Sequence, residues 1–403
     1  PVPRIGERCS THSDCSPVLI LYQRRTLMEV AGNAVGLDLG KRTYEMCLVS
    51  NDNKINRTGG KTDFSGLDKL CMKLTKDDVV AMEACNLAFR IERILREKIG
   101  CRVIILNPGR LAIIFMSTRK TDKEDSMKLA KYIKSHEEEE MPIVTPPSDE
   151  EWERRKLLSE YRALRSQRTR EVNRLHAIFE HAGFTQFTRK DICVPKNREE
   201  ILPLLKGYEK EESERLVERL LLLEKQIELL YKKINDETEK DEKVQKLMTV
   251  PGIGPITALS YVAYIGDVNR FENAHQVSNF IGFVPKVDRS CTINRLGHIT
   301  KQGNSLLRSL LVQAAWSCVR SKNGAALRDK YNYMSVTRGI GKGKSIVTIA
   351  RKMGELLYTL LKNNQCYEPK KFISSDERIS KLAEEALFYA NNRAGDKINL
   401  TCS

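Results

Sequence analysis

The sequence predicts an α/β domain, a long helical hairpin and a mainly α-helical C-terminal domain, in that order. Short apolar strands alternate with amphipathic helices over residues 34–136, a pattern typical of α/β folds. Two long helical segments follow, and the second carries a heptad seam of apolar residues. From residue 247 onward, glycine-rich turns and further helical segments indicate a separate domain.

The composition indicates a folded, multidomain protein with a polyanionic partner. The chain has 403 residues, of which 41% are hydrophobic, and this excludes a disordered chain. The formal net charge of +15 favours nucleic acid as the partner, although a basic but unrelated enzyme is an alternative. No apolar run is long enough to span a bilayer. The 11 cysteines include no C-x-x-C pair and no secretory signal is evident, so we expect a cytoplasmic protein.

The elements of the α/β domain follow from local patterns. Residues 34–50 read as a β-hairpin around a Gly-Lys-Arg turn, and residues 79–84 and 101–106 read as further strands. Helices are expected at 86–99, 109–116 and 123–136. The resulting domain prediction is an extension at 1–33 that we expect to be poorly ordered, the α/β domain at 34–136, an acidic proline-containing linker at 137–150, the helical hairpin at 151–246, the C-terminal domain at 247–370 and a tail at 371–403.

The helical hairpin has a basic first helix and an apolar seam on the second. The first helix runs from Glu151 to about Ala182 and is rich in arginine. The second begins near Glu209, and its apolar residues are spaced 4-3-4-3-4 at Leu216, Leu220, Leu223, Ile227, Leu230 and Ile234. This coiled-coil-like seam is consistent with pairing inside the chain and with dimerisation.

Four acidic residues in the α/β domain suggest a metal site. Asp38 and Glu83 each interrupt an apolar strand, which is costly unless the carboxylate is paired or binds a metal. Asp122 and Asp125 are three residues apart at the start of a predicted helix and so share a face. Such carboxylates suit Mg²⁺, and two such ions can support phosphoryl transfer. Helix caps for the two helical aspartates and a turn role for Asp38 are the structural alternatives.

The C-terminal domain contains candidate nucleic-acid contacts. Residues 247–266 resemble a helix-hairpin-helix motif, in which Gly252 and Gly254 would let backbone N–H groups approach a phosphate; a tight helix connection without a ligand is the alternative. Residues 280–304 read as a basic, turn-rich segment in which Ser290 by itself indicates only a turn or cap. The candidate basic contacts are Lys286, Arg289, Arg295, Lys301, Lys342 and Lys344, for which a solvated basic surface is the alternative.

Ordered motifs over residues 34–370 resemble a known family. The N-terminal half carries V-G-L-D-L-G-K, A-M-E-A, N-P-G-R and K-T-D-K-E-D. The C-terminal half carries V-P-G-I-G-P-I-T-A, F-I-G-F-V-P-K and R-L-G-H-I-T-K-Q-G-N. In these motifs the chain is similar to the DEDD transposases of insertion sequence family 110, in the branch related to 1111, with transposase domains of the 116/110/902 type.

The resemblance implies both a fold and a mechanism. It implies an RNase H-like (resolvase-like) N-terminal domain with a metal-binding tetrad formed by Asp38, Glu83, Asp122 and Asp125, holding two Mg²⁺ ions that Mn²⁺ can replace. It also implies a catalytic serine, which aligns with Ser290, followed here by Cys291 where glycine is usual. A recombinase of this kind would cut, exchange and rejoin double-stranded DNA at the element ends and the target, guided by a structured noncoding RNA from the element.

The same resemblance implies a prokaryotic, nucleoid-associated protein that assembles as a homodimer or homotetramer and has no membrane contact. Two alternatives stay open. A metal-dependent junction-type nuclease would cut DNA without a covalent intermediate. A noncatalytic nucleic-acid-binding protein would use the helix-hairpin-helix motif and the long helices without any metal-dependent activity.

Overall fold

The chain divides into two units, and the boundary falls within the predicted 137–150 segment. The first unit spans Pro1–Pro146 and the second Pro147–Ser403. The computed structural model describes residues 31–114, 122–290, 293–321 and 323–368. The expected N-terminal extension up to residue 30 and the expected tail at 371–403 therefore lie outside the described residues.

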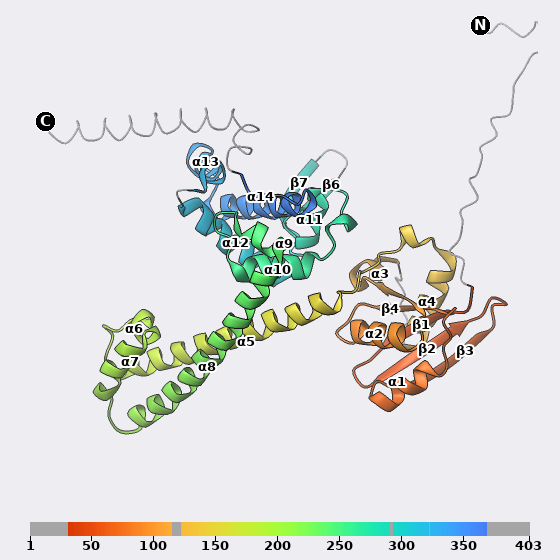
Figure 1. The fold of residues 1–403 in the computed structure, drawn as a ribbon, viewed down its shortest axis with the longest axis horizontal. Helices are drawn as coiled ribbons and strands as arrows, with labels where there is room; N and C mark the ends of the chain where they lie inside the picture. Colours follow the sequence, from red (N-terminus) through yellow and green to blue (C-terminus); the bar gives the residue numbers. More distant parts are fainter. Residues whose placement is uncertain (1–30, 115–121, 291–292, 322, 369–403) are drawn as a thin grey trace, which may run out of the picture. The chain divides into compact units, whose positions relative to one another are not determined.

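The first unit is a mixed five-stranded sheet with helices on both faces (Figure 1). Its strands have the order β3-β2-β1-β4-β5, in which β1 to β3 are antiparallel and β1, β4 and β5 are parallel. This arrangement is consistent with an RNase H-like domain. The elements are β1 (Ala34–Leu39), β2 (Thr43–Val49), β3 (Ile55–Lys61), α1 (Phe64–Cys71), β4 (Val79–Glu83), α2 (Ala88–Lys98), β5 (Arg102–Leu106), α3 (Pro108–Ile114), α4 (Asp122–Ser135) and the 3₁₀ turn η1 (Glu138–Glu140).

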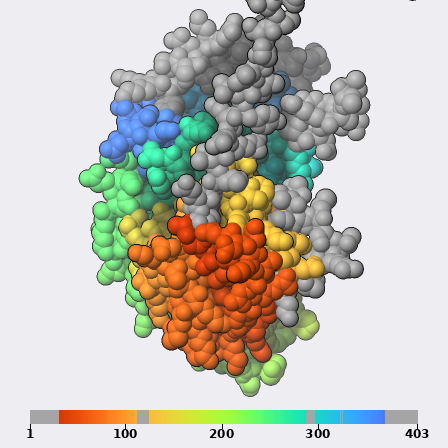
Figure 2. Space-filling view, turned by 90° about the vertical axis from the view of Figure 1, so that its right-hand side faces the viewer, coloured from red at the N-terminus to blue at the C-terminus, as the bar shows by residue number. Residues whose placement is uncertain are grey.

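Alternate residues of the strands form two separate cores. Val35 and Leu37 of β1 pack in one cluster with Leu67 of α1 and Ile91 of α2. Residues that project on the opposite face of the strands, such as Ala34, pack with α4 in a second cluster. Because side chains alternate along a strand, Ala34, Gly36 and Asp38 all face α4. The early residues of the first unit form the continuous red and orange surface in Figure 2.

Helix α4 lies unusually close to β1 because residue 36 is glycine. A Cβ atom at Gly36 would lie 1.9 Å from the carbonyl oxygen of Ser126 and 2.6 Å from the amide nitrogen of Ala130. Both atoms belong to the backbone of α4 and cannot move aside as a flexible side chain can. Only glycine at this position allows the helix to seat directly on the central strand.

The predicted linker at 137–150 is wrong in its first half. Residues 141–144 add to the edge of the sheet through backbone hydrogen bonds, from the amide of Asn107 to the carbonyl of Pro142 and from the amide of Val144 to the carbonyl of Ile105. The edge strand β5 has unpaired backbone groups that need such partners. Met141 is buried in the α4 core, so the segment belongs to the first unit up to this point.

The second unit begins with two long antiparallel helices, α5 (Asp149–His181) and α8 (Gly207–Lys240). Ion pairs along both helices are consistent with the antiparallel register, from Arg154 with Glu237 at 3.6 Å to Arg174 with Glu212 at 2.5 Å. The short elements that connect them at one end are α6 (Arg189–Cys193), α7 (Pro195–Ile201) and the 3₁₀ turn η2 (Leu202–Leu204). A buried cluster that includes Phe179, Ile192 and Leu220 joins these short helices to the long ones.

The heptad seam on α8 is used inside the chain at both of its ends. Leu216 and Leu220 are fully buried in the cluster with α5, α6 and α7, and Ile234 is fully buried in the core of the C-terminal helices. Leu223 and Ile227, in the middle of the seam, are only half-buried. The seam residues at the ends are therefore committed to packing within one chain.

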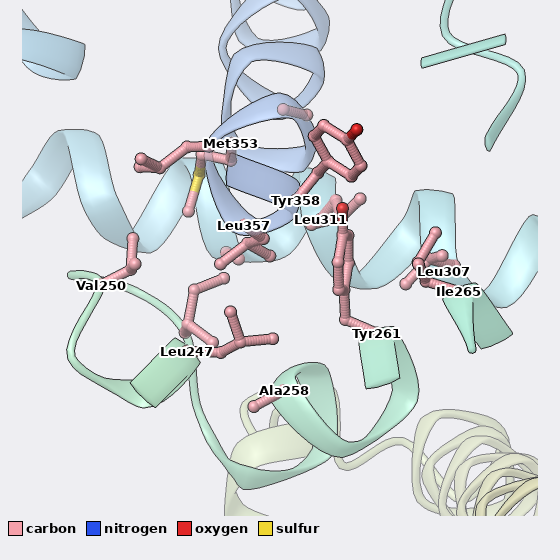
Figure 3. Close-up of a cluster of buried hydrophobic side chains, with 14 of the residues drawn as sticks. Leu247, Val250, Ala258, Tyr261, Ile265, Leu307, Leu311, Met353, Leu357 and Tyr358 are labelled. Carbon is pink, nitrogen blue, oxygen red and sulfur yellow. The ribbon is translucent and has the colours of Figure 1, made fainter. Parts of the chain in front are cut away.

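The remaining helices pack around a common core (Figure 3). Leu247, Tyr261, Leu311 and Leu357 meet there from four helices, and the Tyr261 hydroxyl donates to the carbonyl of Gly354 at 2.7 Å. The elements are α9 (Glu242–Met248), α10 (Pro255–Ile265), η3 (Val268–Arg270), α11 (Ala274–Ile281), β6 (Pro285–Ser290), β7 (Ile293–Ile299), α12 (Ser305–Arg320), α13 (Ala325–Asn332), the π-helical turn η4 (Tyr333–Thr337) and α14 (Lys342–Lys362). Among the described residues, no helix has the length and apolar character that crossing a membrane requires.

Replacing Gly36 by valine tests the contact between α4 and β1. The new side chain would collide with the α4 backbone, so we expect the free energy of unfolding of the first unit to fall by about 1–3 kcal/mol or more. Thermal unfolding followed by circular dichroism measures the effect. Gly109→Ala is the matched control, because its Cβ would meet only the Asn107 side chain at 3.3 Å. Equal stability of the two variants would refute the close-contact explanation.

Replacing Leu220 by glutamate tests the internal use of the seam. Leu220 is 0% exposed, so a carboxylate there would be buried without a partner, and we expect a loss of more than about 3 kcal/mol of stability. Leu222→Glu is the control, since Leu222 is 57% exposed on the same helix. Urea unfolding compares the two. A similar midpoint for both variants would mean that the α5–α8 cluster contributes little to stability.

Candidate active site

Two carboxylates lie at the ends of adjacent parallel strands. Leu37 of β1 is paired with Met82 of β4, and Asp38 and Glu83 are the next residue on each strand. Glu83 is on the same face of β4 as Val79 and Ala81, and these two residues pack in the core between the sheet and α4. Both carboxylates are therefore on the face of the sheet that α4 covers, and both are half-buried.

The first turn of α4 is directed toward the same edge of the sheet. At the other end of the helix, the Lys134 ammonium donates to the carbonyl of Ser50 at 2.7 Å, where β2 ends. Strand β2 is antiparallel to β1 and its Val49 pairs with Ala34, so Lys134 is near the beginning of β1. The first turn, with Asp122 and Asp125, therefore lies toward the end of β1, where Asp38 is found.

The helical positions 122 and 125 have the spacing of the residues of α4 that pack on the sheet. Asp122 and Asp125 are spaced 7 and 4 residues before Leu129, which is buried between α4 and the sheet. The Asp125 carboxylate pairs with the Lys128 ammonium at 3.3 Å. The backbone of Asp122 begins α4, and its side chain lies outside the described residues. The backbone thus gathers all four predicted acidic positions at one edge.

A further acidic residue, Glu45, lies in the same row. It is paired with Asp38 across the antiparallel strands β1 and β2, and with Gly59 on β3. Paired residues project on the same face of a sheet, so Glu45 also belongs to the α4 side. Glu45 was not among the predicted site residues, although its place in the predicted hairpin at 34–50 could have identified it as the partner of Asp38.

The donor types fit a hard divalent cation, but the described side chains do not form a finished metal site. Carboxylate oxygens are the ligands that Mg²⁺ prefers. Within the described part of the chain, no group of three or more His, Cys, Asp or Glu side chains is arranged to hold a metal ion. Burial raises the pKa of both Cys101 and Cys318 to about 11, so these thiols stay protonated and are poor metal ligands. At this edge the described carboxylates are those of Asp38, Glu83, Glu45 and Asp125.

Ser290 is the last residue of β6 and pairs with Ile293 of β7. The expectation of a turn-rich segment at 280–304 is therefore wrong in part, because β6 and β7 pair as a two-stranded antiparallel sheet. Cys291 lies outside the described residues. Arg289 pairs with Asn294 and Arg295 with Asp288, so the hairpin brings these two predicted contacts and Ser290 into one short ribbon. Lys286 is exposed on the same strand, and Lys301 follows the hairpin.

The two glycines of the predicted helix-hairpin-helix motif have different surroundings. Gly252 has a φ of +88°, and its Cβ would lie 2.4 Å from the carbonyl oxygen of Ala314 on α12. Packing between helices is therefore sufficient to explain the glycine at 252. Gly254 caps α10, and a Cβ added there would meet no atom of the described residues within 4 Å, so packing does not explain the glycine at 254.

The two predicted lysine contacts near the C-terminus lie together. Lys342 and Lys344 are exposed in the first turn of α14, directly after the cap residue Gly341. Cations near a helix N-terminus are electrostatically unfavourable unless an anion approaches. This placement is compatible with phosphate contact, while Gly252 on the connection before α10 is explained by packing.

Comparison with known proteins gives consistent matches over both units. A DEDD transposase model of the IS110 type matches residues 35–183, and the model of the transposase IS116/IS110/IS902 family matches residues 244–332. The chain is 24% identical over 353 residues to the transposase for insertion sequence element IS1111A of Coxiella burnetii, a match that covers 86% of this chain and 93% of that protein.

Two other relatives extend the comparison. The transposase for insertion sequence element IS1328 of Yersinia enterocolitica is 26% identical, and the match covers 70% of this chain and 82% of that protein. The pilin gene-inverting protein of Moraxella bovis is 23% identical, with coverage of 83% and 98%. The relatives thus include proteins named for transposition and a protein named for inversion of a gene.

Proposed function

On the premise, supported by the comparisons, of an insertion-sequence transposase in the IS116/IS110/IS902 family, we propose that the chain cuts, exchanges and rejoins DNA strands with the Asp38 carboxylate at the centre of its active site. The observation that carries this proposal is the register of β1 and β4. In this register Asp38 and Glu83 follow the paired residues Leu37 and Met82, on the face of the sheet that α4 covers.

The proposed role of the four carboxylates is to hold Mg²⁺ ions, for which Mn²⁺ is a substitute. Asp38, Glu83, Asp122 and Asp125 would be the ligands, and bound ions would stabilise negative charge on the phosphate and the leaving oxygen during phosphoryl transfer. The chain itself positions these groups: the strands fix Asp38 and Glu83, and the contact at Gly36 fixes α4. Glu45, in register with Asp38, adds negative charge to the same row.

Ser290 is the proposed nucleophile. Its hydroxyl oxygen would form a bond to phosphorus as the bond from phosphorus to one DNA oxygen breaks, and the proton would pass to the released DNA hydroxyl. Rejoining is the reverse exchange with another DNA end. The support is the alignment of Ser290 with the family motif and its place on a ribbon that also carries Lys286, Arg289 and Arg295. A serine hydroxyl needs activation, and cations around the phosphate can supply it.

The proposed partners are double-stranded DNA and a noncoding guide RNA from the element. Backbone N–H groups near Gly254, and the cations Lys286, Arg289, Arg295, Lys301, Lys342 and Lys344, are the proposed phosphate contacts. Gly252 shares the turn with Gly254. We also propose assembly as a homodimer or homotetramer. The half-buried middle of the α8 seam is compatible with this, whereas its buried ends are not available.

The main competing function is a metal-dependent junction-type nuclease that hydrolyses DNA without a covalent intermediate. Such a nuclease would use the same carboxylates as the proposed recombinase, so only the role of Ser290 distinguishes the two functions. A noncatalytic nucleic-acid-binding protein would need neither the carboxylates nor the serine.

Asp38→Asn tests the metal-binding carboxylates. We expect this variant to lose Mg²⁺-dependent strand cleavage and to keep DNA binding, because one charged ligand is removed while the shape of the side chain is preserved. Cleavage of labelled element-end DNA and gel-shift binding are measured side by side, with Mn²⁺ as a second ion. Asp52→Asn is the control, since Asp52 is exposed in the turn after β2. Normal cleavage by Asp38→Asn would rule out the metal assignment.

Ser290→Ala tests the covalent step. With a nicked suicide substrate that prevents rejoining, we expect the unmodified chain to accumulate a DNA–protein adduct that peptide mass places on Ser290. The adduct should be absent in Ser290→Ala and in Asp38→Asn, and present in the control Ser166→Ala, which changes an exposed serine of α5. Cleavage that persists in Ser290→Ala would favour the junction-type nuclease instead.

A further inference from the structure

Helix α12 carries a surface hollow whose lining combines an aromatic ring with polar donors. The hollow has a volume of about 570 Å³ and is lined by Gln313, Trp316, Ser317, Arg320 and Ser321. The first four of these residues follow helical spacing and therefore form one stripe along the helix. A volume of this size lies within the range of about 300–1,000 Å³ that is usual for small-molecule sites.

The floor of the hollow is a stack of flat groups. The Arg320 guanidinium carbon lies 5.2 Å from the centre of the Trp316 ring. Trp316 also meets the Tyr331 ring edge-on, with centroids 5.7 Å apart and an interplanar angle of 66°. Tyr331 thus braces the indole, while Arg320, Gln313 and Ser317 are exposed. Nucleobases stack on aromatic rings and on guanidinium planes alike.

The charge of the surrounding sequence favours an anionic ligand. From residue 289 to residue 354 the chain has 13 Lys and Arg residues and one acidic residue, Asp329. Helix α12 itself contains no Asp or Glu. In a chain with 53 acidic residues among 403, so long an interval with a single acid indicates a surface that meets a polyanion. A cationic ligand would find no counter-charge among the residues that line the hollow.

We propose that the hollow on α12 binds an unpaired nucleotide, with its base stacked against Trp316 and Arg320 and its edge or sugar hydrogen-bonded by Gln313 and Ser317. This inference rests on the proposed function and deepens it, because strand exchange and RNA pairing both leave unpaired nucleotides. Helix α12 would then contact a nucleobase, which the proposed phosphate contacts do not do. Stacking is tolerant of sequence, so the site would hold a strand without selecting its bases.

Tryptophan fluorescence provides a direct readout. The chain has two tryptophans, Trp152 and Trp316, so Trp152→Phe leaves Trp316 as the only indole reporter. We titrate this full-length variant, in the presence of a metal chelator that prevents cleavage, with short single-stranded DNA, with single-stranded RNA of the same sequence, and with a DNA strand of the same length whose central positions are abasic. The strand with bases should quench the emission, and the abasic strand should bind at least about tenfold more weakly with no quenching.

Variants separate stacking from charge. Trp316→Leu and Arg320→Gln should each weaken binding of the strand with bases by about tenfold, and Trp316→Phe should restore most of the binding. Arg338→Gln is the matched control, because it removes an exposed arginine from the same acid-poor region but outside the hollow. It should weaken the strand with bases and the abasic strand equally. If Trp316→Leu does not fold, Arg320→Gln and the abasic strand still decide the question.

The results of these binding experiments can be told apart from the results of the cleavage tests. Equal binding of the strand with bases and the abasic strand, or equal effects of Arg320→Gln and Arg338→Gln, would overturn the stacking site even if the chain cuts DNA. Quenching by the base-containing strand in a chain that proves unable to cut would sustain the site and refute the proposed function. Tighter binding of DNA or of RNA would identify which strand the site holds.

Discussion

The contact between the backbone of α4 and Gly36 is the constraint on which the candidate active site depends. A side chain at this position would need the space of the Ser126 carbonyl, so the helix can seat on the central strand only over glycine. Asp38 is two residues after Gly36 on β1, and Asp122 and Asp125 are in the first turn of α4. The distance between Asp38 and these two residues therefore depends on how closely α4 packs against β1. The Lys134 bonds to the end of β2 fix the other end of α4. The helix is thus held at both ends relative to Asp38.

Most of the first unit could be predicted from the sequence because its strands are apolar and its turns are marked. The hairpin at 34–50, the strands ending on Glu83 and Leu106, and the helix carrying Asp125 are all present, and their bounds differ by one or two residues. Strand β3 was not predicted, since Asn56, Arg57, Gly59 and Gly60 give it no apolar alternation. It is an edge strand that exists through pairing with β2, which a local pattern cannot reveal.

In the second unit, fewer of the elements could be predicted from the sequence. The two long helices follow from their length, whereas α6 and α7, at 5 and 7 residues, are too short to give a periodic signal and depend on packing against Phe179 and Leu220. The β6–β7 hairpin is rich in polar residues and forms through backbone pairing. For the candidate site, the types and order of the acidic residues were predictable, and the predicted hairpin at 34–50 could have added Glu45, whose pairing with Asp38 the strand register shows.

The distribution of charge suits the proposed function, in which different parts of the chain would bind DNA and cut it. Carboxylates clustered at the end of β1 repel a phosphate backbone unless cations intervene, so this cluster cannot supply affinity for DNA by itself. In the proposed function, the interval from 289 to 354, with its single acid, would supply that affinity without a cluster of carboxylates. Stacking at Trp316 would add a contact that salt does not screen, unlike the phosphate contacts of exposed lysines. A substrate could then be held through strand exchange even while individual phosphate contacts are released, which is what repeated cutting and rejoining on one complex requires.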